Sequence, residues 1–261
     1  NLNNKVETVE DLERYGLPLI GNIPYVKTNG EPNPSGIDKS VVTFHKPYSQ
    51  AAELYRKLRT NIQFSSIEKE IKSLIITSNN PKEGKTTLSA NLGIIYANIG
   101  KSVLLVDADL RKSNLHKILN VENRVGLADY LAGDAEMKDI IKETKHENLY
   151  IITAGKMSPN PAEMIGSTKM KELIHRLRSY WDMTIYDAPP LQPVTDSLLL
   201  CKYIDYIVLS TFSKRTKIDG LLDAIKEVQN TNEQIGGVVL TGIKKKEMKY
   251  RYKKYYKYEE G

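Results

Sequence analysis

The stretch Ser78-Asn79-Asn80-Pro81-Lys82-Glu83-Gly84-Lys85-Thr86-Thr87 decides the fold. It follows an apolar run, 74–77, that is typical of a short buried strand, and it precedes small and apolar residues, 88–99, that are typical of a helix. A strand, a tight loop and a helix opening on Gly-Lys-Thr form the setting in which a P-loop match is informative. Backbone N–H groups and the helix N-terminus of such a loop bind phosphate, so the sequence predicts a nucleotide site.

Individual residues of this loop have separate expected roles. Lys85 is expected to reach the β- and γ-phosphates, and the Thr86 hydroxyl to ligate Mg²⁺. A full Gly-x-x-x-x-Gly-Lys-Thr motif would have glycine at position 79; Asn79 tolerates left-handed backbone angles better than most residues, so the turn is expected to survive. The alternative to a nucleotide-binding loop is an ordinary strand-to-helix turn that happens to contain Gly-Lys-Thr-Thr. The predicted nucleotide-binding residues are Asn80, Pro81, Lys82, Glu83, Gly84, Lys85, Thr86 and Thr87.

Length and composition indicate one α/β domain with an appendage. The 261 residues are 40% hydrophobic and 27% charged, as in soluble globular proteins, and they contain no run of about 18 apolar residues that would span a membrane. The chain begins with Asn1 and shows no signal-peptide pattern, so we expect it to be a segment of something longer.

Cysteine and histidine usage gives no catalytic or metal signal. The single cysteine, Cys201, lies in an apolar run and is expected to be a core residue in a reducing, cytoplasmic setting. The four histidines lack ligand spacing, so no metal site built from His or Cys is expected. They are His45, His116, His146 and His175.

The net charge of +6 belongs mostly to residues 244–261, where eight Lys or Arg face three acids. This tail has almost no aliphatic residue, and we expect it to be flexible. Its alternating Lys and Tyr residues could also bind anionic lipid or nucleic acid. The tail contains five tyrosines: Tyr250, Tyr252, Tyr255, Tyr256 and Tyr258.

The first 45 residues have a different composition from the rest. Residues 7–15 could form one short helix, and several prolines, glycines and asparagines follow. This composition makes a poor core and indicates a linker or a docking arm.

A helix is predicted over 51–64, with apolar residues at three- and four-residue steps. Glu53, Arg56 and Arg59 recur every three residues beside the apolar stripe. Such a charged stripe fits equally well a solvated face with helical ion pairs and a contact surface.

Two further apolar runs end in aspartate. Residues 103–106 lead into Asp107-Ala108-Asp109-Leu110-Arg111, and residues 183–186 lead into Asp187-Ala188-Pro189-Pro190. Carboxylates at the carboxyl ends of central strands lie where open α/β sheets bind ligands, and Mg²⁺ with a phosphate needs such oxygen ligands. The alternatives are an Asp that caps the next helix and Asp-Pro turn chemistry.

The remaining segments alternate between strand and helix patterns. This alternation implies a mostly parallel sheet covered by helices on both faces, a P-loop NTPase-type α/β fold. The predicted helices are 126–131, 137–143, 168–180 and 218–230, and the predicted strands are 149–153, 206–210 and 236–240.

In this order, the motifs resemble those of the bacterial tyrosine kinases of capsule and exopolysaccharide assembly. Three sequence forms carry the resemblance: the P-loop form Ser78-x-x-Pro81-x-x-Gly84-Lys85-Thr86-Thr87, Asp107-x-Asp109-x-Arg111 as Walker A′, and Asp187-x-Pro189-Pro190 as Walker B. Glu53-x-x-Arg56-x-x-Arg59 is similar to the family's oligomerisation motif, and the tail to its tyrosine cluster. The resemblance covers roughly residues 45–261.

The resemblance implies an ATP- and Mg²⁺-dependent protein-tyrosine autokinase. Its catalytic residues would be Lys85, Asp107, Asp109 and Asp187, with Thr86, Asp107 and Asp187 around the metal. Asp109 would orient or deprotonate the incoming tyrosine, whose hydroxyl has a pKa near 10 in solution. The tail tyrosines would be phosphorylated between subunits of a ring built by Glu53, Arg56 and Arg59. Each phosphate would add about −1.5 to −2 charge to the basic tail.

The resemblance also implies partners and a division of the chain. Residues 1–45 are similar to the cytoplasmic end of the membrane chain-length determinant, which is fused or separate in this family, so the protein would work at the inner face of the cell membrane. A tyrosine phosphatase and polysaccharide-synthesis enzymes would be further partners, whereas nucleic acid is not expected as one. The expected units are an adaptor-like arm (1–45), a P-loop kinase domain (46–243) and the tyrosine-rich tail (244–261).

Two rival functions share these motifs. Septum-positioning and plasmid-partition ATPases also have a P-loop and Asp-ending strands, but they carry a signature lysine at the place of Asn80 and glycines at those of Asn79 and Pro81. A nucleotide-dependent scaffold without tyrosine transfer is the other. Where the family often has Asn near the end of the last strand, this chain has Thr241-Gly242, so the sequence gives no residue that recognises adenine.

Overall fold

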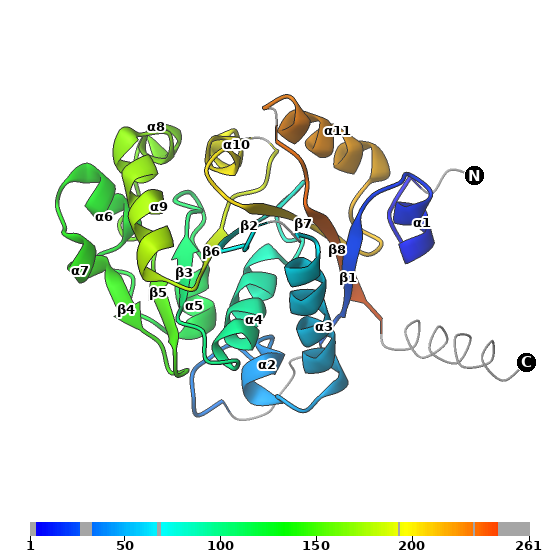
Figure 1. Cartoon of the computed structure of the whole chain (residues 1–261), viewed down its shortest axis with the longest axis horizontal. Coiled ribbons are helices and arrows are strands. Elements are labelled where there is room, and N and C mark those ends of the chain that lie inside the picture. Colours follow the sequence, from blue (N-terminus) through cyan, green and yellow to red (C-terminus); the bar gives the residue numbers. More distant parts are fainter. Residues whose placement is uncertain (1–3, 27–32, 67–68, 193, 232, 245–261) are drawn as a thin grey trace, which may run out of the picture.

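The computed structural model describes residues 4–26, 33–66, 69–192, 194–231 and 233–244. These residues form one eight-stranded sheet in the order β1-β8-β7-β2-β6-β3-β5-β4 (Figure 1). All neighbouring strands are parallel except β4 and β5. The strands are β1 (Leu19–Pro24), β2 (Ser73–Ser78), β3 (Val103–Asp107), β4 (Ile141–Glu143), β5 (Leu149–Ile152), β6 (Met183–Asp187), β7 (Tyr206–Phe212) and β8 (Gly237–Ile243).

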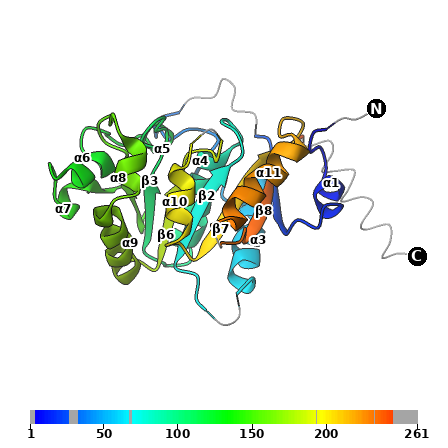
Figure 2. The ribbon, with the colours of Figure 1, turned by 90° about the horizontal axis from the view of Figure 1, so that it is seen from above.

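Helices cover both faces of the sheet, so the central strands β2, β3 and β6 are buried along their whole length. Helices α3, α4 and α5 lie over one face, and α9, α10 and α11 over the other (Figures 1 and 2). This arrangement confirms the predicted α/β fold. The helices are α1 (Val9–Glu13), α2 (Val42–His45), α3 (Gln50–Phe64), α4 (Lys85–Ala97), α5 (Leu115–Leu119), α6 (Leu127–Ala132), α7 (Met137–Ile140), α8 (Pro161–Ile165), α9 (Thr168–Tyr180), α10 (Asp196–Cys201) and α11 (Ile218–Gln229).

One predicted helix is half wrong. The stretch 137–143 forms α7 only as far as Ile140, and Ile141–Glu143 then pair antiparallel with β5 as β4. Ile141 has extended backbone angles and lies opposite Ile152. The β-branched side chain of Ile141 and its pairing with Ile152 favour the extended chain over another helical turn.

The arm contributes more to the fold than its composition predicts. The expectation of a poor core is wrong, because β1 adds a parallel strand beside β8 and buries Ile20 and Ile23. Val6 and Leu12, before this strand, are fully buried as well. Pairing with β8 overrides the weak strand propensity of Gly21, Asn22 and Pro24. The predicted boundary at residue 45 stays a prediction.

The predictions for Cys201 and for the tail have different outcomes. Cys201 is fully buried, as predicted, and burial raises the pKa of its thiol to about 12. The predicted flexible tail lies outside the described residues beyond Lys244, as do its five tyrosines. No helix in the described ranges combines the length and the apolar character that crossing a membrane requires.

Candidate active site

The nucleotide-binding loop joins the end of β2 to the start of α4. Gly84 is the N-cap of α4 and has φ +87°, a left-handed conformation that glycine adopts without a steric penalty. Lys82 also has a positive φ, of 64°. Asn79 does not: the turn survives as predicted, with its left-handed residues three and five positions after Asn79.

Asn79 fits at this position because α11 approaches it through a glycine. The Asn79 side chain is buried, and a Cβ atom added to Gly220 would lie 2.5 Å from its Nδ2 atom. A side chain at 220 would therefore collide with Asn79. The packing of α11 accommodates the residue that replaces the first P-loop glycine.

The two Asp-ending strands bring their carboxylates together beside Lys85. Asp107 and Asp187 are direct neighbours in the β3–β6 register, and both are buried. Lys85 Nζ lies 3.1 Å from Asp109 Oδ2 and 3.9 Å from Asp187 Oδ1. The structure thus gathers all four predicted catalytic residues at the carboxyl edge of the sheet.

Further hydrogen bonds fix the carboxylates. Asp107 Oδ2 accepts from the Leu115 N–H at 3.1 Å, and Asp109 Oδ1 accepts from the Lys112 N–H at 2.9 Å. The Ser89 hydroxyl donates to Asp187 Oδ1 at 3.3 Å. Asp187 Oδ2 is buried and has no hydrogen-bond partner among the described residues. Sequence analysis missed Ser89, although its place one helical turn after Lys85 puts it on the same face of α4.

Burial and mutual repulsion change the pKa values of these groups. Desolvation, and next the neighbouring Asp187 carboxylate, raise the pKa of Asp107 to about 8. Desolvation also raises the pKa of Asp187, against the opposing effect of Lys85. Burial lowers the pKa of Lys85, but the carboxylates of Asp187 and Asp109 outweigh it and raise the pKa overall. Three carboxyl groups share one ammonium, so a bound cation, which stabilises their ionised forms, is favoured here.

Arg111 ties the Walker A′ segment to α10. Its Nε and Nη2 atoms donate to Asp196 at 2.9 and 3.2 Å, a bidentate pair with a carboxylate that is completely buried. Sequence analysis singled out Arg111 but gave it no partner. No spacing rule connects it to Asp196, which lies 85 residues later.

The charged stripe on α3 lies partly in solvent and partly against α4 of the same chain, and its role as a contact surface stays a prediction. Arg56 forms an ion pair with Glu53 at 2.7 Å, as a solvated helical face would. Arg59 Nη1 donates to the Ile95 carbonyl at 3.4 Å, whereas its buried Nε has no partner among the described residues. Arg56 and Arg59 also line a hollow of about 570 Å³ with the exposed Tyr48.

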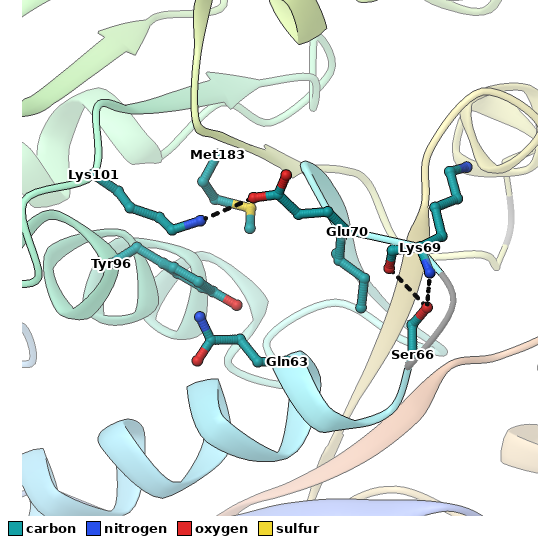
Figure 3. A pocket seen from close by; sticks show the side chains of 8 residues that line it. Gln63, Ser66, Lys69, Glu70, Tyr96, Lys101 and Met183 are labelled. Atoms are coloured by element: carbon teal, nitrogen blue, oxygen red, sulfur yellow. Dashed lines mark hydrogen bonds and ion pairs between the residues drawn. The ribbon is translucent and has the colours of Figure 1, made fainter.

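A smaller hollow, of about 330 Å³, is lined by residues of α3 and α4 and by residues at the starts of β2 and β6, whereas the nucleotide-binding loop follows the end of β2 (Figure 3). It lies near the start of β2, where a Lys101–Glu70 pair at 3.4 Å crosses it. None of the predicted site residues lines it. Its lining residues are Gln63, Ser66, Lys69, Glu70, Ile71, Tyr96, Lys101 and Met183.

Comparison with known proteins decides the family. A model of the AAA domain family matches residues 71–236. The chain is 37% identical over 210 residues to tyrosine-protein kinase YwqD of Bacillus subtilis strain 168, covering 80% of this chain and 89% of that protein. The chain belongs to the bacterial tyrosine-protein kinases. Tyrosine-protein kinase wzc of Salmonella typhimurium is 28% identical over 265 residues, an alignment that covers 98% of this kinase but 37% of the longer protein.

Solved structures agree with this assignment. The kinase domain of Escherichia coli tyrosine kinase ETK superposes with a TM-score of 0.85 at 28% identity, covering 92% of this kinase and 96% of that chain. The septum site-determining protein MinD of Pyrococcus horikoshii OT3, complexed with Mg-ADP, gives 0.57 at 28% identity, covering 65% and 69%. The kinase thus has the P-loop fold that it shares with the rival ATPases, and it is a nucleotide-binding protein.

Thr241, where the sequence offered no adenine contact, has a different role. Its hydroxyl donates to the carbonyls of Thr211 and Glu83, at 2.8 and 3.1 Å. It therefore joins β8 to β7 and to the nucleotide-binding loop, and its side chain faces the protein interior.

Proposed function

We propose that this kinase transfers phosphate from ATP to its own C-terminal tyrosines, between subunits of a homo-oligomeric ring, and so regulates capsular or extracellular polysaccharide synthesis and export. The observation that carries the proposal is Lys85, held between the carboxylates of Asp109 and Asp187 where the loop meets α4. This placement puts the loop lysine, the Walker A′ carboxylates and the Walker B carboxylate within one site.

Mg²⁺ fits the three carboxyl groups that share Lys85 and the buried Asp187 Oδ2 atom without a partner. In the described part of the chain no group of three or more His, Cys, Asp or Glu side chains is arranged to hold a metal ion. Asp107, Asp187 and the Thr86 hydroxyl would supply the protein ligands, and phosphate oxygens and water the others. When bound, Mg²⁺ neutralises charge that develops on the transferred phosphoryl group.

Nucleotide binding would redistribute the contacts of Lys85. The triphosphate competes with Asp109 for the ammonium, which frees the Asp109 carboxylate to accept a proton. The tyrosine oxygen then forms its bond to the γ-phosphorus as the bond to the β–γ bridging oxygen breaks; the hydroxyl proton goes to Asp109, and ADP leaves. Lys112, whose backbone N–H binds Asp109 Oδ1, helps to orient that carboxylate.

Ring assembly would use the stripe on α3. Glu53 is 69% exposed and Arg56 31%, and the hollow beside them contains Tyr48, which is 96% exposed. A neighbouring subunit would cover these side chains. Arg56→Ala and Arg59→Ala are expected to lower the mass measured by light scattering, and phosphate transfer with it.

The partners follow from the same proposal. The chain-length determinant, fused or separate, would hold the kinase at the inner face of the membrane through the arm. A tyrosine phosphatase would reset the tail, and polysaccharide-synthesis enzymes would be further substrates. Phosphate on several tyrosines would reverse the positive charge of the tail and change what it binds.

Phosphate mapping by mass spectrometry, with ATP and Mg²⁺, tests the proposal. Phosphotyrosine is expected within 250–258 in the wild type and absent in Lys85→Met. Lys101→Met is the control, since it makes the same change beside Glu70, away from the loop, and should leave the phosphotyrosine in place. ATP turnover without phosphotyrosine would indicate a partition-type ATPase, and nucleotide binding without turnover a scaffold.

A mixing experiment tests transfer between subunits. Lys85→Met, with its tail intact, is combined with a variant that has Phe at all five tail tyrosines. Phosphate on the tail of Lys85→Met supports transfer between subunits. A Lys85→Met tail that stays unmodified beside an ATP-hydrolysing partner would contradict it.

A further inference from the structure

Glu83 occupies an unusual place in the nucleotide-binding loop. Its side chain is completely buried, although it lies between two residues with positive φ, Lys82 and Gly84. A left-handed conformation at a non-glycine residue is strained and persists only where surrounding contacts fix it. The contacts that fix this turn converge on Glu83.

Both oxygens of the Glu83 carboxylate accept hydrogen bonds. Oε2 accepts from the Asn80 N–H at 3.0 Å, inside the loop, and Oε1 accepts from the Thr216 hydroxyl at 2.6 Å, outside it. The loop is therefore bound from within and also anchored to the segment after β7. Burial raises the pKa of Glu83, and the bonds from Asn80 and Thr216 oppose that change.

Thr216 has its hydrogen-bond direction fixed. The Phe212 N–H donates to its hydroxyl oxygen at 2.8 Å, so the single hydroxyl proton is left for Glu83. Thr216 is itself fully buried, and its carbonyl accepts from the Val6 N–H at 2.9 Å. Glu83 is thus held by a fixed donor.

Two neighbouring contacts hold the backbone of the same turn. The Glu83 carbonyl accepts from the hydroxyls of Ser210, at 2.6 Å, and Thr241, at 3.1 Å. Arg215 donates to the Lys82 carbonyl at 2.5 Å. The Glu83 carbonyl therefore points to buried hydroxyls of the protein interior. Because N–H and C=O point in opposite directions across a trans peptide, the N–H of Gly84 faces away from the interior, where a phosphate would bind.

We propose that Glu83 is a positioning residue for nucleotide binding, and that Thr216 holds its carboxylate so that the loop is preformed before the phosphates arrive. The inference rests on the proposed nucleotide site. It adds Glu83 as a residue that does not touch the nucleotide and holds the backbone of the loop in place. The loop is then already ordered in the folded protein, so nucleotide binding does not have to order it. Loss of the Thr216–Glu83 hydrogen bond would therefore weaken nucleotide binding.

Titration of ADP with Mg²⁺ into the whole chain, followed by calorimetry, tests this. Thr216→Val removes the hydroxyl and keeps the shape of the side chain. Glu83→Gln replaces one of the two carboxylate oxygens, which accept from Asn80 and Thr216, with an NH2 group that cannot accept. Each is expected to raise the Kd by about tenfold. Thr216→Ser, which keeps the hydroxyl, should bind as the wild type does. The double variant should bind no more weakly than either single one, because both break one link.

A readout of kinetics separates positioning from general damage. KM for ATP is expected to rise about tenfold in Thr216→Val with kcat within about threefold, measured at a temperature where the variant is fully folded. Its melting temperature should fall, because the Phe212 N–H and the Glu83 carboxylate each lose a buried partner. Thr231→Val is the matched control, since its hydroxyl bonds the Val228 carbonyl at the end of α11. Unchanged Kd in Thr216→Val, or failure of Thr216→Ser to restore it, would overturn the inference; a wild type that binds no ADP would overturn the proposed nucleotide site as well.

Discussion

An aspartate with a buried side chain lies at each edge of the sheet, Asp205 at the amino edge and Asp107 at the carboxyl edge. Their surroundings change their pKa values in opposite directions. Asp205, just before β7, has a side chain that is 4% exposed and bonds to the backbone N–H groups of Lys72 and Ser73, both at 3.1 Å. Arg178 and Lys69 pair with it at 2.6 and 2.8 Å. Although burial raises its pKa, the bonds from Arg178 and Lys69 outweigh burial and lower the pKa to about 2.

Asp107, at the other end, has neighbours of its own charge. Asp187 lies beside it in the sheet register, Asp109 is two residues away, and Lys85 pairs directly with those two neighbours. Burial and Asp187 raise the pKa of Asp107 to about 8. The amino end thus holds a carboxylate whose charge is matched, typical of a structural role. The carboxyl end holds carboxylates whose charge is not matched, typical of a ligand site.

The largest expected effect separates catalysis from stability. Asp187→Asn should lower the kinase rate by about 10²–10³-fold, because it removes a metal ligand and a partner of Lys85. Its free energy of unfolding should change by less than about 1 kcal/mol, since repulsion of Asp107 is relieved at the same time. Asp205→Asn should cost about 2–4 kcal/mol, because Arg178 loses its partner, and should leave the rate of the folded protein unchanged. Kinase assays and urea unfolding of both variants give the answer, and a fully active Asp187→Asn would contradict the comparison.

Stability should depend on pH in opposite directions at the two ends. The folded pKa of Asp107, about 8, lies above its ordinary 3.8. Its contribution to the free energy of unfolding is therefore present below pH 4 and is lost as pH rises to 8. Asp205, with a folded pKa of about 2, contributes above pH 4 and loses that contribution as pH falls to 2. In metal-free buffer, Asp107→Asn should remove a decline on the order of a few kcal/mol between pH 4 and 8, at about 1.4 kcal/mol per pKa unit. A urea midpoint of the wild type that rises over this interval would show that Asp107 is ionised in the fold.

The two arginines test how many partners a buried carboxylate needs. Arg111→Ala leaves the fully buried Asp196 without its bidentate partner and should cost about 2 kcal/mol, at the low end because Arg111 is 39% exposed. Arg178→Ala should cost about 1 kcal/mol, since Asp205 keeps Lys69 and the Ser73 donors. Urea unfolding at pH 7 compares them. Equal losses would mean that the remaining donors of Asp205 contribute nothing.

Most of the fold was predictable because the apolar runs and turn motifs of the sequence indicate the same strands and helices that the assembled sheet contains. Apolar runs ending in Asp107 and Asp187 become adjacent parallel strands, and the Gly84-Lys85 turn opens a helix, as the motifs indicate. The strand 19–24 was missed because Gly21, Asn22 and Pro24 oppose it locally. It is stabilised by pairing with β8, more than 200 residues away, and by contacts with α3, where Asn61 donates to the Ile20 carbonyl at 2.7 Å.

In the site, sequence spacing predicts which residues meet but not how they are paired. The motif places Lys85 near the carboxylates, but nothing in it says that Asp109 is the carboxylate nearer to its ammonium. The partners of Glu83 and Arg111 lie 133 and 85 residues away. Such contacts depend on loop conformation after the sheet is assembled, which hydrophobic periodicity does not encode.

The smallest expected effect concerns the exposed member of the amino-end cluster. Lys69 pairs with Asp205 at 2.8 Å but is 66% exposed, so water and salt screen its charge. Lys69→Ala should therefore cost no more than about 0.5 kcal/mol in urea unfolding, and the loss should vanish in 0.5 M salt. Lys72→Ala, whose pair with Glu70 is longer at 3.9 Å, is the control. A loss above about 1.5 kcal/mol that persists in salt would mean that Arg178 and the backbone donors do not by themselves compensate Asp205, and that charge matching at this end requires every cation present.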